Sequence, residues 1–237
     1  MKMKSQFTRR GLWIGGMSLF LVTILTILLF RNTGSFIATA INQFGPQVTE
    51  VETRVDAVYL NPLTGSASLR GFFLGNPKGY ESPSAVEVSS MSLKVVPSSL
   101  TTSTIVLDRV DIESPVITWE GSLSESNLSK IEKNLSSSAN SKETQSTRKV
   151  IIRSLRVENA ILRVKLKGLT KEHMEISLPT IDMKNIGGTD GASAADAASQ
   201  VLNQVLAKSA FALKQSPDLL EKGLKNVVDG LKGLFKK

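Results

Sequence analysis

Residues 107–115 read Leu-Asp-Arg-Val-Asp-Ile-Glu-Ser-Pro, and residues 152–160 read Ile-Arg-Ser-Leu-Arg-Val-Glu-Asn-Ala. The two stretches align without gaps at an offset of 45 residues, and residues 69–77 (LRGFFLGNP) align with the first at an offset of 38. Each is apolar at its first, fourth and sixth positions and ends in Asn or Ser followed by Pro or Ala. A repeat of this size predicts hairpin-sized units that stack side by side into one curved antiparallel sheet. The alternative is a chance alignment of three amphipathic strands.

The sequence on either side of the repeat also has strand character. From Val51 to Tyr59, apolar residues and Thr alternate with mostly charged residues, and this period of two is typical of a strand with one buried face. We therefore predict a mainly β domain over residues 48–186, with further strands at 67–75, 86–96, 104–119, 149–167 and 172–183. The stretch from Asn76 to Tyr80 (Asn-Pro-Lys-Gly-Tyr) is predicted to be a tight connection between two of them.

A Ser-rich segment interrupts the strands. Nine of the 25 residues from Ser122 to Ser146 are Ser, and we interpret residues 121–147 as a surface loop. A short helix near residues 127–135 is an open alternative, because Leu128, Ile131 and Leu135 are spaced three and four residues apart.

The last part of the chain, residues 187–237, is predicted to form amphipathic helices. One begins at a capping box from Ser193 to Asp196 and reaches Gln215, and a second begins at Ser216-Pro217. The second carries an apolar stripe beside several lysines, formed by Leu220, Leu224, Val227, Leu231 and Leu234. Such helices cover the sheet, lie on a membrane or pair with a partner helix.

The N-terminal region has the pattern of a membrane anchor. Residues 11–30 contain no charge and, as a helix, are long enough to span about 30 Å of hydrocarbon. Basic residues are more numerous before this run than after it, which predicts a cytoplasmic tail over 1–10 and export of the rest. The flanking residues of the anchor are Arg9, Arg10, Trp13 and Arg31, and residues 31–47 form a juxtamembrane helix or linker. The competing interpretation is a signal peptide cleaved near Ala38-Thr39-Ala40.

Composition and charge argue against reactive chemistry. The chain has no Cys and a single His, His173, so thiol chemistry and the usual metal sites are not expected. We predict a non-enzymatic protein without a cofactor. Residues 32–192 hold 17 basic and 17 acidic residues, so the formal charge of +8 belongs to the two ends of the chain. That distribution favours membrane lipids as partners and argues against nucleic acid.

Together these features resemble the start of AsmA-like proteins, the AsmA/TamB type of the Gram-negative envelope, of which this chain would be a short member. The likeness rests on the anchor, the turn at Gly75-Asn-Pro-Lys-Gly-Tyr80, the run Ile105–Glu120 and Ser126-Asn-Leu128. The resemblance implies a single-pass inner-membrane protein with its bulk in the periplasm. It also implies a groove of β-strands with an apolar lining that serves lipid transport or outer-membrane homeostasis.

We expect the groove to bind acyl chains, and its predicted lining is Phe73, Val88, Leu93, Ile105, Leu107, Val110, Ile112, Leu155, Val157, Val164 and Ile176. The main alternative is a structural or adaptor subunit of an envelope protein complex, whose sheet is covered by its own C-terminal helices. A plant-type late-embryogenesis domain also carries an Asn-Pro turn, but the repeat argues against it. A periplasmic hydrolase is disfavoured, because no nucleophile and base are evident.

Overall fold

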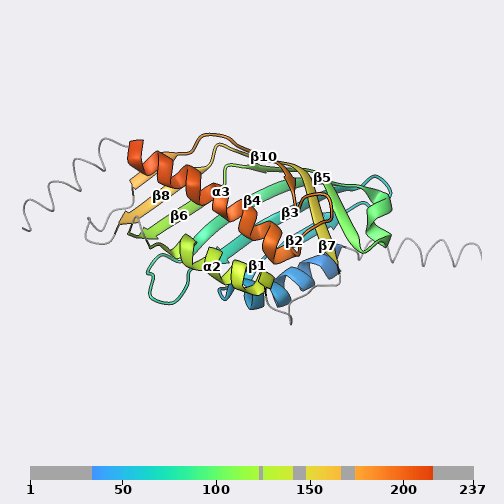
Figure 1. The fold of residues 1–237 in the computed structure, drawn as a ribbon, viewed down its shortest axis with the longest axis horizontal. Helices are drawn as coiled ribbons and strands as arrows, with labels where there is room; N and C mark the ends of the chain where they lie inside the picture. Colours follow the sequence, from blue (N-terminus) through green and yellow to red (C-terminus); the bar gives the residue numbers. More distant parts are fainter. Residues whose placement is uncertain (1–33, 123–124, 141–147, 167–173, 216–237) are drawn as a thin grey trace, which may run out of the picture.

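The computed structural model describes residues 34–122, 125–140, 148–166 and 174–215, and it shows one curled, half-barrel sheet with helices on its inner face (Figure 1). The fold is mainly β with helical additions, as predicted. The strands are β1 (Thr53–Arg54), β2 (Ala57–Leu60), β3 (Ser66–Gly75), β4 (Ser84–Val95), β5 (Thr104–Glu113), β6 (Val116–Gly121), β7 (Lys149–Glu158), β8 (Ile161–Leu166), β9 (Met174–Ser177) and β10 (Ile181–Ile186). The helices are residues 34–49, η1 (Pro97–Thr101), α2 (Asn127–Asn140) and α3 (Ala194–Gln215).

The ten strands lie along six lines that cross the sheet in chain order. Four of these lines contain two strands each. The strands β1 and β2 both pair with β3, and β5 and β6 both pair with β4. In the same way β7 and β8 run beside β5 and β6, while β10 and β9 run beside β7 and β8. The sheet therefore consists of six long lines, each beside the line that precedes it in the chain.

The internal repeat coincides with the register of the sheet. Leu107 lies opposite Ile152 and Val116 lies opposite Ile161, so the offset of 45 residues seen in the sequence is the pairing of two neighbouring lines. These lines are parallel, whereas their other pairings are antiparallel. The prediction of an antiparallel sheet is thus wrong at one place: the sheet is mixed, because the chain returns from β6 to β7 through a helix.

A crease crosses the whole sheet where the lines are interrupted. The register places Gly71 of β3, Ser89 of β4, Ser114, Asn159 and Pro179 next to one another in that order. Three of these residues have left-handed backbone angles, with φ of 64° at Gly71, 52° at Ser114 and 53° at Asn159. Each such residue shifts the side-chain alternation by one position and bends its strand. The aligned bends curl the sheet into a half-barrel.

Helix α2 replaces most of the predicted Ser-rich loop 121–147. Ser126 caps the helix: its hydroxyl accepts from the backbone N–H of Ser129, and its own N–H donates to the Ser129 hydroxyl. Leu128, Ile131 and Leu135 are buried against the sheet. The alternative of a short helix at this position was therefore the better interpretation, because the apolar spacing outweighs the many serines of the exposed face.

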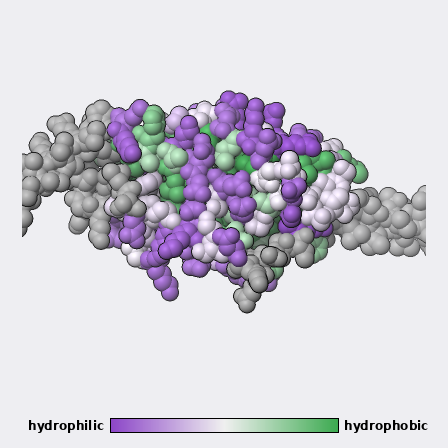
Figure 2. Space-filling view, in the orientation of Figure 1, coloured by the Kyte–Doolittle hydropathy of each residue, from purple (hydrophilic) through white to green (hydrophobic). Residues whose placement is uncertain are grey.

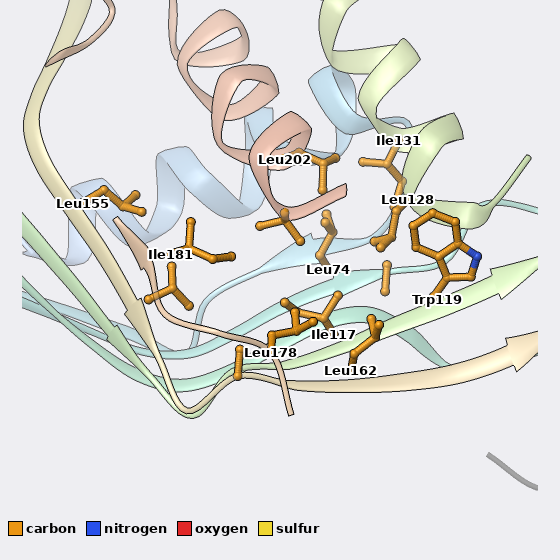
Figure 3. Close-up of a cluster of buried hydrophobic side chains, with 14 of the residues drawn as sticks. Leu74, Ile117, Trp119, Leu128, Ile131, Leu155, Leu162, Leu178, Ile181 and Leu202 are labelled. Atoms are coloured by element: carbon orange, nitrogen blue, oxygen red, sulfur yellow. The ribbon is translucent and has the colours of Figure 1, made fainter. Parts of the chain in front are cut away.

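Helix α3 crosses over α2 and the sheet, and the hydrophobic core lies between these layers (Figure 3). Ile181, Leu162 and Leu128 are among its fully buried side chains. The helix of residues 34–49 runs along the edge formed by β1 and β2. Its Asn42 side chain accepts from the N–H of Val55 and donates to the Val55 carbonyl, which satisfies the backbone between the two strands.

Candidate functional site

The concave face of the sheet carries three successive rows of apolar side chains, here called the apolar rows. Residues that are Cα partners across neighbouring strands point to the same face, so each row can be followed from strand to strand. The first row is Leu69, Met91, Ile112, Val157 and Ile181; the second is Ala67, Leu93, Val110, Leu155 and Met183; the third is Val95, Leu107, Ile152 and Ile186. No position of the rows holds a polar residue, which makes this face a continuous apolar surface.

The two helices bury one half of the apolar rows more deeply than the other. The main contacts of α3 with the sheet are with β7 and β10, and those of α2 are with β6. Accordingly Leu155, Val157 and Ile181 are at most 3% exposed. Met91, Leu93, Leu107 and Ile112, on β4 and β5, are only partly buried and form what we call the half-buried strip. This strip is the candidate site, because it is the apolar part of the concave face that the helices cover least.

Most of the predicted groove residues lie on the concave face. Val110, Leu155, Val157 and Val164 belong to the buried core, and Leu93, Leu107, Ile112 and Ile176 pack against it while partly exposed. Ile105 is partly buried beyond Leu107, and Val88 is buried beside its partner Phe72. The sequence alternation was sufficient to identify this face. It did not identify Met91 and Met183, which occupy the rows without having been predicted.

Phe73 does not belong to the apolar rows. Along β3 the neighbours Phe72 and Leu74 point to the core, so Phe73 points to the convex face. There the guanidinium of Arg54 lies 4.4 Å from the centre of its ring, in a cation–π contact with its partner residue on β1. Its inclusion in the groove lining was wrong, because Gly71 shifts the alternation within the repeat unit.

A buried polar network holds α2 and the Asn-Pro turn against β6. The Asn127 amide donates to the Asn76 side chain (2.7 Å) and to the Thr118 carbonyl (2.8 Å), and its oxygen accepts from the N–H of Glu120 (2.9 Å). Asn76 in turn donates to the Ser82 carbonyl at 2.7 Å. The predicted tight connection at residues 76–80 is thus fixed from inside the protein, and these amides have structural partners rather than a free binding edge.

Glu120 fastens the far side of the same turn. Its carboxylate accepts from the N–H groups of Glu81 and Ser82, both at 2.7 Å, and Lys165 lies 3.8 Å away. Burial raises the pKa of Glu120, but the hydrogen bonds and Lys165 outweigh it, so the pKa stands below its ordinary value. Sequence reasoning missed Glu120 and Asn127, because nothing in the local pattern shows that residues 38 to 51 positions apart meet.

A second carboxylate joins the two covering helices. Glu132 of α2 accepts from Ser136 (2.7 Å) on its own helix and from Ser199 (2.9 Å) and Asn203 (3.1 Å) of α3. The Ser136 hydrogen bond, with those from α3, lowers the pKa of Glu132 although burial opposes this. The bonds hold α3 across the concave face, so the position of this cover depends on an ionised glutamate.

Three arginines of the convex face are paired with carboxylates. Arg153 lies 3.1 Å from Asp108, Arg156 lies 3.0 Å from Glu158, and Arg163 lies 2.9 Å from Glu175. All of these side chains are well exposed, where such pairs contribute little to stability. Arg153, Arg156 and Arg163 therefore belong to a solvated face on which their charges are balanced by neighbouring carboxylates.

Several predicted features lie outside the described residues. These are the anchor with Arg9, Arg10, Trp13 and Arg31, His173, and the stripe of Leu220, Leu224, Val227, Leu231 and Leu234. Among the helices that the structure describes, none combines the length and apolar character needed to cross a bilayer. Within the same residues, no three His, Cys, Asp or Glu side chains are grouped as metal ligands.

Comparison with known proteins adds no relative to this description. No family model, curated protein or solved structure matches the chain.

Proposed function

We propose that this protein is a membrane-anchored, AsmA-like protein that binds acyl chains of lipids on the concave face of its sheet and contributes to lipid transport or outer-membrane homeostasis. The observation that supports the proposal is the half-buried strip, an apolar surface of Met91, Leu93, Leu107 and Ile112 inside a curled sheet. The uncharged run of residues 11–30 supports a location at a membrane.

The size of the sheet suits one chain rather than a bridge between membranes. Six lines about 4.8 Å apart give a width of about 24 Å before curling. The eight residues from Ile105 to Ile112 extend about 26 Å at 3.3 Å per residue. An acyl chain fills about half of a 30 Å hydrocarbon core, or 15 Å, and so fits along the strip.

The proposed binding is passive. Each methylene group that leaves water for an apolar surface contributes about 0.8 kcal/mol, and a bilayer offers a similar environment. Transfer of a chain between the bilayer and the strip is therefore close to balanced in free energy. The proposal requires no cofactor and no reactive side chain, and it places the protein among non-enzymatic lipid carriers.

The test is lipid co-purification from native membranes followed by mass spectrometry. Leu93→Asp places a charge on the concave face, and Ser92→Asp places the same charge on the convex face one residue away on β4, where Ser92 is exposed. We expect lipid with the parent and with Ser92→Asp and a loss with Leu93→Asp. Leu93→Trp, which fills the strip without adding a charge, should also lose lipid while preserving the circular dichroism spectrum.

Two results would end this proposal. One is a parent protein, purified from its native membrane in mild detergent, that carries no lipid above an unrelated membrane protein. The other is equal lipid content in Leu93→Trp and Ser92→Asp.

A second candidate function is an adaptor subunit of an envelope complex. The observation that favours it is the cover formed by α2 and α3, under which four of the predicted groove residues are core residues. Under this proposal the surface docks a partner and the concave face only stabilises the fold. The lipid co-purification described above separates the two, because an adaptor of this kind carries no lipid on its concave face.

A further inference from the structure

Three of the five large apolar side chains that are exposed in the described part of the chain lie at one end and edge of the sheet. Phe36 is 72% exposed, Leu63 78% and Tyr59 55%. They belong to three segments: the start of the helix 34–49, the turn between β2 and β3, and β2 itself. Exposed aromatic and aliphatic side chains that cluster in this way mark an interaction surface, whereas single apolar residues scattered over a surface do not.

Backbone contacts bring these segments together with η1. Gly34 lies so close to the backbone of Val58 and Tyr59 that a Cβ atom would collide with it, which fixes the start of the helix on β2. The N–H of Val95 donates to the Gly65 carbonyl at 2.7 Å, which joins the β2–β3 turn to the connection that contains η1. Figure 1 shows the start of the helix and η1 at the same end of the molecule.

This end is free of charge over long stretches. Residues 34–49, 57–69 and 95–107 contain no Asp, Glu, Lys or Arg. In Figure 2 the coloured surface at the right-hand end is largely white and green, while hydrophilic residues dominate the centre. Two cations stand at its margin: the Lys94 ammonium donates to the Thr64 carbonyl at 2.8 Å, and the Arg70 guanidinium lies 5.4 Å from the centre of the Tyr59 ring. Aromatic residues with a marginal Lys are typical of a surface at the membrane interface.

The position of residues 11–30 in the chain indicates what this end meets. The uncharged run ends at Phe30, four residues before Gly34, and four extended residues reach at most about 14 Å. If residues 11–30 span a bilayer, the uncharged end must lie at its surface.

We propose that the uncharged end, formed by Phe36, Tyr59, Leu63 and η1, inserts into the interfacial region of the lipid bilayer and holds the sheet upright on the membrane. The inference rests on the membrane anchoring in the proposed function. It adds a second contact besides the anchor, one made by the folded domain. It also points the third apolar row, with Val95 and Leu107 near this end, toward the lipids.

The test uses the full chain in vesicles of phosphatidylethanolamine and phosphatidylglycerol. Because the protein has no Cys, single Cys residues for a fluorescent label can be introduced at Ser98 in η1 and at Lys78 in the Asn-Pro turn. Both are exposed, and β3 separates their ends of the sheet by about 30 Å. Lipids with a nitroxide high on the acyl chain should quench the label at Ser98 and leave that at Lys78 unchanged.

The contribution of the surface itself is separated from that of the tether by substitution. Phe36→Glu with Leu63→Glu should remove the quenching at Ser98, whereas Phe211→Glu on α3, where Phe211 is 54% exposed, should not. Equal quenching in the presence of the double substitution, or none at Ser98 in vesicle-bound parent, overturns the inference. If the parent does not float with vesicles at all, the anchoring in the proposed function has failed instead.

Discussion

Replacement of Asn127 by Ala should destabilise the protein by about 4 kcal/mol, because its side chain serves two buried backbone groups and the half-buried Asn76 side chain. Asn127 is fully buried, and it satisfies the N–H of Glu120, the carbonyl of Thr118 and the side chain of Asn76. Removal of the amide leaves two backbone groups without partners, and each costs about 1–3 kcal/mol. A loss of 4 kcal/mol is large beside the total stability of about 5–15 kcal/mol of a typical domain.

The assay is urea unfolding followed by tryptophan fluorescence in a Trp13→Phe background. Trp119 is then the single reporter; it is 4% exposed, and its indole donates to the Ser122 carbonyl beside Asn127. Asn140→Ala is the matched control, because Asn140 lies on the same helix and makes one exposed hydrogen bond to Ser136. We expect less than about 0.5 kcal/mol for the control.

Two outcomes would refute this reasoning. If Asn127→Ala loses less than about 1 kcal/mol, water must satisfy the backbone groups of β6, and the network is not closed. If the loss appears with Asn140→Ala as well, the effect belongs to helix α2 as a whole and not to the buried amide.

Three further substitutions test the turn, the cover and the crease. The pKa of Glu120 in the folded protein lies below its ordinary value of 4.5. The ionised carboxylate therefore stabilises the folded protein above pH 4.5, and this stabilisation is lost as the pH falls through the folded-state pKa. In Glu120→Gln the urea midpoint should accordingly fall less on acidification than in the parent. Glu132→Ala removes the bonds to Ser199 and Asn203, so we expect about 1–2 kcal/mol of lost stability and faster hydrogen exchange in α3 than in β4, with Lys133→Ala as a neutral control. Gly71→Ala should lower the free energy of unfolding by more than the roughly 1–2 kcal/mol that a left-handed Ala costs, because the new methyl group collides with the Asp56 carboxylate. The additional substitution Asp56→Ala should restore part of the lost melting temperature.

The repeat was the most informative sequence feature for the sheet, because its offset of 45 is the register between two lines. The alternation of apolar residues also identified the concave face, at Val110, Leu155 and Val157 among others. Local patterns cannot show where left-handed residues shift that alternation. Gly71, Ser114 and Asn159 do so along the crease of the sheet, and Phe73 was misassigned because of the shift at Gly71.

The contacts around the candidate site were not predictable in the same way. Asn127 meets Asn76 across 51 residues of sequence, and Glu132 meets Ser199 across 67. Such long-range hydrogen bonds depend on how the helices pack on the sheet. The periodicity of apolar residues within a single strand or helix carries no information about them. Asn, Glu and Ser are also residue types that are mostly exposed in proteins, so the sequence gives no sign that these particular side chains are buried.

The parallel pair of lines explains why this sheet has a cover. The repeat units at Leu69 and Ile152 are each followed by a return strand, namely β4 and then β9 with β10. The unit at Leu107 is followed by α2 instead, and the third unit therefore pairs with it directly and in parallel. A return strand would have extended the concave surface by one line. The helix that replaces it lies on that surface, where Leu128 and Ile131 join the core and Glu132 holds α3. One change of secondary structure within a repeat thus narrows the concave face and covers part of it, and the half-buried strip on β4 and β5 is the part that the helices cover least.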